Sequence, residues 1–156
     1  LYQCMAYPEA ADAYGACVEQ ALEVGHSLMA AQGLMGLGHT WFMRDDNPQA
    51  TECYAGAQAL FAKLGLPHFE AYALTWQGES AALADDRPRA RLHFERAVQL
   101  CDEMDPMYAS TTRSTKADVL LRLARLYDDA GVREQAARCR HEADQLGATA
   151  APCHHP

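Results

Sequence analysis

The sequence predicts an all-α protein organised as an α-solenoid, in which about seven helices form antiparallel pairs with a repeat of about 40 residues. Pro8, Pro48 and Pro88 are spaced 40 residues apart, and each is followed two residues later by Ala. An aromatic residue and a further small residue follow at offsets of four and three, which is the spacing of one helix face. No segment alternates apolar and polar residues between turns, so we expect no sheet.

Each unit is expected to contain two helices joined by a tight turn. Asp45-Asp46-Asn47-Pro48 interrupts the helical pattern in one unit, and Asp85-Asp86-Arg87-Pro88 does so in the next. Proline suits the first position of a helix because its φ is already helical and its missing N–H would be unpaired there. Asn47 is a suitable N-cap. The predicted helices span residues 9–23, 28–44, 48–63, 68–84, 88–103, 108–129 and 133–146.

Small and aromatic residues predict how the helices pack. Gly38 and Gly78 lie on the first helix of each full unit, where the missing side chain lets two helix backbones approach closely. Tyr54 and Phe94 are expected to fill the space between successive units. The paired Asp residues recur at the end of first helices, so we interpret them as solvated caps rather than as catalytic acids and bases.

The chain of 156 residues lies in the single-domain range. We expect residues 1–147 to form the array, with a truncated first unit, two full units and a longer last unit, followed by a flexible tail at 148–156. Because the chain starts at Leu1 rather than Met, we expect a piece of a longer protein. The truncated unit leaves the apolar face of residues 9–23 unpartnered, which predicts homodimer formation through the N-terminal end.

Composition excludes several classes of protein. The 21 acidic and 13 basic residues give a formal charge of -8, which opposes binding to nucleic acid. No apolar run approaches the roughly 20 residues of a membrane-spanning helix, so we expect no membrane partner. The six cysteines show no short pairing, which indicates reduced thiols in a cytoplasmic protein.

Catalytic motifs are missing from the sequence. Gly33-x-x-Gly36-x-Gly38 lies in a helical pattern with no preceding strand, so it does not indicate a dinucleotide site. Residues of the types that bind zinc occur near the C-terminal end of the chain. Their irregular spacing indicates incidental residues rather than a metal site. We therefore predict no enzymatic activity, no metal and no cofactor. The zinc-type residues are Cys139, His141, Cys153, His154 and His155.

Over roughly residues 1–147 the repeat resembles the tetratricopeptide repeat (TPR) family. The resemblance is carried by the small residue of the first helix, by Ala-x-x-x-aromatic-x-x-Ala in the second, and by Trp41 or Tyr127 three residues after the small position. Units of 40 residues resemble the C-terminal TPR sensor regions of large bacterial transcriptional regulators of the antibiotic regulatory protein and maltose-activator types, which belong to the STAND ATPase class.

The resemblance implies a non-enzymatic protein- or peptide-binding module, the sensing or assembly region of a cytoplasmic regulator. The alternative is a stand-alone receptor for a small signalling peptide, and an enzyme with a metal site in the tail is the least favoured reading. An ATPase domain and a winged-helix domain upstream of this chain would favour the regulator over the stand-alone receptor.

In the TPR family the first helices of successive units line a concave groove. Three columns of residues follow from that arrangement by position, and together they are the predicted partner-binding site. The His, Glu and Arg of one column either recognise a polar partner or are three solvated residues. Met35 and Met43 flank His39, and they form either an adaptable binding surface or ordinary core. The columns are His39, Glu79 and Arg125; Met35, Thr75 and Leu121; and Gln32, Tyr72 and Asp118.

Overall fold

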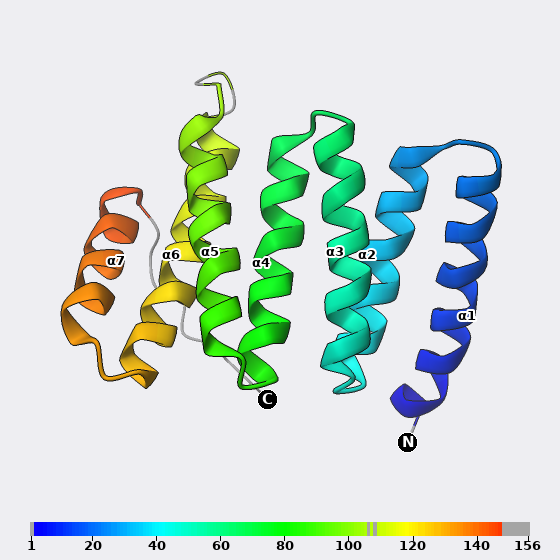
Figure 1. The fold of residues 1–156 in the computed structure, drawn as a ribbon, viewed down its shortest axis with the longest axis horizontal. Coiled ribbons are helices and arrows are strands. Elements are labelled where there is room, and N and C mark those ends of the chain that lie inside the picture. Colours follow the sequence, from blue (N-terminus) through cyan, green and yellow to red (C-terminus); the bar gives the residue numbers. More distant parts are fainter. Residues whose placement is uncertain (1, 106, 108, 148–156) are drawn as a thin grey trace.

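The computed structural model describes residues 2–105, 107 and 109–147. Over these residues the chain forms seven α-helices and no strand, which confirms the all-α solenoid (Figure 1). Each helix packs against the next one in the chain, and α4 also contacts α6. The helices are α1 (Tyr2–Glu23), α2 (Ser27–Met43), α3 (Asn47–Lys63), α4 (Pro67–Leu83), α5 (Arg87–Glu103), α6 (Ala109–Asp129) and α7 (Arg133–Gln145).

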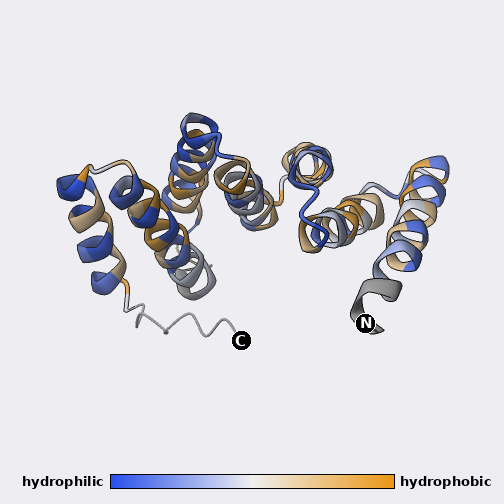
Figure 2. Ribbon diagram, turned by 90° about the horizontal axis from the view of Figure 1, so that it is seen from below, coloured by the Kyte–Doolittle hydropathy of each residue, from blue (hydrophilic) through white to orange (hydrophobic). Residues whose placement is uncertain are grey.

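Consecutive pairs build a curved array. Seen along the helix axes, α2, α4 and α6 lie on the inner side of the curve, and α3 and α5 lie on its outer side (Figure 2). The inner helices are the first helices of their units, so the helices that carry the predicted columns lie on the concave side. No helix among the described residues has the length and apolarity needed to cross a membrane.

The first helix differs from its prediction. It begins at Tyr2 rather than near residue 9, and Pro8 lies inside it. A proline within a helix removes one N–H from the hydrogen-bond ladder, but the backbone continues in helical conformation past it. Pro8 therefore does not mark a helix start, although Pro48 and Pro88 do lie in the first turns of α3 and α5.

In the turns after α2 and α4, two adjacent aspartates have different structural roles. Asp45 and Asp85 adopt left-handed backbone angles, with φ of 59° and 60°. The next residue is the N-cap: the Asp46 carboxylate accepts a hydrogen bond from the Gln49 N–H at 3.3 Å. The prediction that Asn47 is the cap is wrong by one residue, because the left-handed Asp45 reverses the chain early enough for Asp46 to face the free amides.

Glycines permit the closest helix contacts, as the sequence predicts. A Cβ added to Gly38 would lie 2.6 Å from Cε1 of Tyr54, and one added to Gly78 would lie 2.5 Å from Cε1 of Phe94. Both aromatic rings are buried. Each ring therefore occupies the space above the glycine of its own helix pair, and each also belongs to a cluster that includes the first helix of the next unit.

The last unit is longer because α6 is extended. Helices α2 and α4 have 17 residues each, whereas α6 has 21. Aligning the repeats on Gly78 and Ala124 shows that α6 begins about one turn earlier than α4 does. Thr111 lies in this additional turn, on the inner helix layer. The residues inserted in the last unit thus lengthen a helix that lines the concave side.

Candidate functional site

The nine predicted residues differ in how far they reach the surface. Gln32, Tyr72, Asp118 and Arg125 are exposed, while His39, Glu79 and Leu121 are half-buried. Met35 and Thr75 are buried, at 7% and 4% exposure. The Thr75 hydroxyl donates to the Ala71 carbonyl at 2.8 Å, so this side chain belongs to the core and cannot contact a partner.

His39 lies at the centre of an aromatic cluster that joins three helices. Its Nδ1 is 2.7 Å from the Tyr54 hydroxyl, and its Nε2 is 3.5 Å from the Tyr72 hydroxyl. The ring packs edge-on against Trp76, with the ring centroids 4.7 Å apart. Burial raises the pKa of Tyr54, so this phenol remains protonated at neutral pH. The cluster therefore links the surface at Tyr72 to the core at Tyr54.

The protonation of His39 should make stability depend on pH. Burial lowers the pKa of His39 below its ordinary value of 6.5. As pH falls below 6.5, the unfolded chain binds a proton that the folded chain does not, so the free energy of unfolding should decrease. We expect His39→Gln to flatten this dependence between about pH 5 and 7, because the amide can still bond Tyr54 but does not titrate.

Urea denaturation of both proteins at several pH values measures this difference. His93, whose pKa burial also lowers, contributes equally to both proteins and provides the residual slope. Identical slopes in wild type and His39→Gln would contradict the prediction.

A charged cluster continues the site from α4 to α6. The Arg122 guanidinium lies 2.7 Å from Glu79 and 2.9 Å from Asp118, and it stacks over the Trp76 ring at 5.3 Å from its centroid. Burial alone would lower the pKa of Arg122, but Glu79 and Asp118 outweigh it and the net shift is upward. Arg122 is therefore a fixed positive charge that lies over the indole of Trp76 and pairs with Glu79.

Arg125 is the more available cation of the two. It reaches Glu79 at 3.4 Å, and its side chain is 58% exposed, whereas that of Arg122 is 19% exposed. A surface pair of this length and exposure contributes little stability, so most of the guanidinium donors of Arg125 remain open to a ligand.

Trp76 and Arg122 are not among the nine predicted residues, although the repeat contains a signal for both. They occupy the same position in successive units, two residues before the small residue, where the first full unit has Gly36. That position lies four residues after Tyr72 or Asp118 on the same helix face. Including it as a fourth column would have found both residues.

An apolar cavity of about 350 Å³ adjoins the aromatic cluster through Tyr72. Three of the predicted residues line it, together with residues from the end of α3, the start of α4 and the start of α6. Phe61 and Phe69 stack there, with centroids 5.2 Å apart and ring planes 20° apart. Met35 lines the cavity, and Met43 is 60% exposed. The lining consists of Gln32, Met35, Phe61, His68, Phe69, Tyr72, Thr111 and Thr115.

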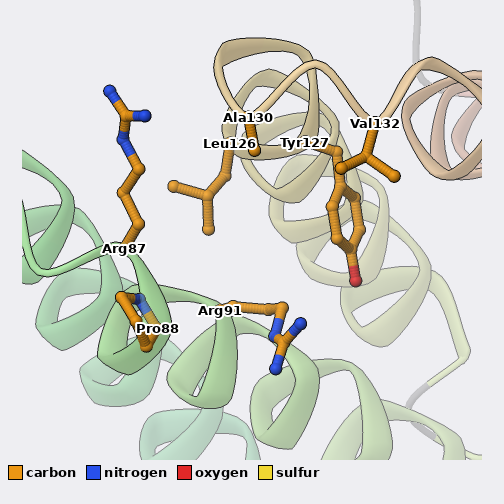
Figure 3. Close-up of a pocket in the computed structure, with 7 residues that line it drawn as sticks. All are labelled: Arg87, Pro88, Arg91, Leu126, Tyr127, Ala130 and Val132. Carbon is orange, nitrogen blue, oxygen red and sulfur yellow. The ribbon is translucent and has the colours of Figure 1, made fainter.

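A second pocket, of about 220 Å³, contains none of the nine predicted residues. In Figure 3 the side chains of Arg87, Pro88 and Arg91 on α5 lie opposite those of Leu126, Tyr127, Ala130 and Val132. Arg91 lies 3.6 Å from Glu95, which also accepts the Tyr127 hydroxyl at 3.1 Å. This pocket lies between the start of α5 and the α6–α7 turn, apart from the aromatic cluster.

Metal and thiol chemistry find little support in the part of the chain that the structure describes. No group of three or more His, Cys, Asp or Glu side chains is arranged there to hold a metal ion. Cys153, His154 and His155, and the predicted flexible tail as a whole, lie outside the described residues. Burial raises the pKa of the Cys53 and Cys101 thiols to about 11, which disfavours the reactive thiolate.

No protein-family model matches the chain, and no curated protein matches it. Among solved structures, the chain is similar to BtubC (BKLC) from P. vanneervenii, with a TM-score of 0.76 and 21% sequence identity. The match covers 96% of this chain and 59% of that one, so this chain spans less than two thirds of its length. The likeness shows a shared helical repeat fold.

Proposed function

We propose that the chain is a non-enzymatic TPR module that binds a protein or peptide in its concave groove. We further propose that it serves as the sensing or assembly region of a cytoplasmic transcriptional regulator. The groove comprises the exposed polar and aromatic side chains of α2, α4 and α6, with Tyr72 and Arg125 as exposed anchors. Support comes from the repeat pattern and from the inner position of these three helices.

The observation that carries the proposal is that Tyr72 and Arg125 are exposed while each contacts a neighbouring side chain that is itself held in place. Tyr72 is 44% exposed, and its hydroxyl approaches His39, which holds it at the surface of the aromatic cluster. Arg125 is exposed and only loosely paired with Glu79. Glu79 is itself held by Arg122. A partner would therefore contact the Tyr72 ring and the Arg125 guanidinium, whose neighbours are themselves held in place. Tyr and Arg are among the residues that contribute most to binding at protein interfaces.

Peptides selected from a random-peptide library on the purified chain provide a probe of this groove. We expect Arg125→Ala and Tyr72→Ala each to weaken binding of the tightest selected peptide by about tenfold or more, which corresponds to about 1.4 kcal/mol. Melting temperatures should change little, because both side chains are exposed. Isothermal titration calorimetry and thermal melts measure the two effects.

Glu52→Ala is the matched control, since Glu52 is an exposed residue of α3 on the outer layer. It should alter neither binding nor melting. Normal binding by Arg125→Ala together with loss of binding by Glu52→Ala would place the binding surface elsewhere and overturn the proposal. The formal charge of -8 further predicts that basic and neutral peptides are enriched in the selection.

A further inference from the structure

The apolar cavity beside Tyr72 is lined mainly by aromatic and apolar side chains. Among the described residues, none of the side chains that line it is Asp, Glu, Lys or Arg. Phe61, Phe69, Tyr72 and Met35 supply aromatic and apolar surface, Gln32, Thr111 and Thr115 supply polar groups, and His68 supplies an imidazole. A cationic ligand would find no carboxylate in this lining, and an anionic ligand would find no Lys or Arg.

The additional turn of α6 completes the cavity. Thr111 lies in that turn and Thr115 in the next one, and both face residues contributed by α2, α3 and α4. The corresponding helices α2 and α4 lack this turn. The cavity is therefore specific to the last unit, where the start of α6 meets residues of α2, α3 and α4. A volume of about 350 Å³ lies within the range of small-molecule sites.

The geometry points to a binding site for a neutral aromatic small molecule in this cavity, one whose flat ring system packs against Phe69 and Tyr72. Apolar walls with a few polar groups are the usual composition of such sites. Gln32 and Thr111 offer hydrogen-bond donors and acceptors, and the Thr115 hydroxyl, which donates to the Thr111 carbonyl at 3.0 Å, can still accept, so these groups would orient a hydroxyl or amine on the ring. The ligand goes beyond the proposed function, because it is a small molecule that binds in the absence of a peptide, although both contact Tyr72.

The probe is N-phenyl-1-naphthylamine, a neutral aromatic amine whose fluorescence rises in apolar surroundings. We expect saturable binding of one probe per chain. The matched charged probe, 1-anilinonaphthalene-8-sulfonate, has the same ring system with a sulfonate, and we expect it to bind at least about tenfold more weakly because no Lys or Arg lines the cavity to pair with the sulfonate. Equal binding of the two probes would indicate a nonspecific apolar surface and would overturn the inference.

Two substitutions on α6 locate the probe. Thr111→Trp places an indole at the cavity and should weaken binding of the neutral probe by about tenfold or more. Ser114→Trp adds the same indole at an exposed position of the same helix that does not line the cavity, and it should bind the probe as wild type does. Melting temperatures of both variants verify that they fold.

Loss of binding in both variants, or in neither, would contradict a site in this cavity.

Discussion

Replacing Gly78 with Leu should lower the free energy of unfolding by about 3 kcal/mol or more, the upper range for overpacking in a core. The first atom of any side chain at this position would already lie 2.5 Å from the ring of Phe94, which is 1% exposed and belongs to the core cluster shared by α4, α5 and α6. The buried ring cannot move away without displacing α6. Urea denaturation followed by circular dichroism measures the change.

Gly15 provides a control with the opposite sign. A Cβ added there would meet no atom within 4 Å, and the residue lies within α1. Gly15→Ala should therefore stabilise the chain by about 0.5–1 kcal/mol through helix propensity, whereas Gly78→Ala should destabilise it. A Gly78→Leu protein as stable as wild type would show that the close contact between α4 and α5 is not as described.

Removing Glu79 should also have a large effect. Glu79→Leu is expected to lower the free energy of unfolding by about 1–3 kcal/mol, because Arg122 is only 19% exposed and would lose its closest carboxylate. The carboxylate that remains near Arg122 is that of Asp118, which is 58% exposed and therefore a weak partner. The loss is smaller than for a fully buried ion pair, since both side chains retain some contact with water.

The double variant Glu79→Leu/Arg122→Met tests the cause. The double variant leaves only the exposed Asp118 and Arg125 without these partners, and a methionine can pack against Trp76, so much of the lost stability should return. A double-mutant cycle from denaturant melts isolates the interaction between the two side chains. Additive effects of the two single substitutions would contradict an energetically important pair.

The fold could be predicted because repetition multiplies weak local signals. A single Pro-x-Ala or a single glycine is a weak signal for structure. The same spacing repeated after 40 residues predicts both helices of a unit and the small residue at the contact between them. Errors occurred where the repeat is imperfect. Pro8 begins no helix although its counterparts do, and the cap is Asp46 rather than Asn47 because a left-handed aspartate precedes it.

The candidate site was predicted less completely, for reasons that lie in three-dimensional packing. Position in the repeat correctly placed Tyr72 and Arg125 at the surface, but the same rule selected Thr75, which the structure buries. The pairing of Glu79 with Arg122 joins residues of different helices, and the sequence alone does not show which of several arginines a carboxylate contacts. The cavity depends on how far α6 extends, which helix periodicity does not determine.

The neighbour-by-neighbour packing of the helices has a consequence for the speed of folding. Most packing is between helices adjacent in the chain, although α2 also contacts α4 through His39 and α4 contacts α6, where the ion pair between Glu79 and Arg125 spans 46 residues of sequence. Proteins dominated by contacts of short sequence separation close small loops and fold quickly. In such an array any helix pair can form first and extend in either direction, so truncation from one end should slow folding little while it removes stability unit by unit.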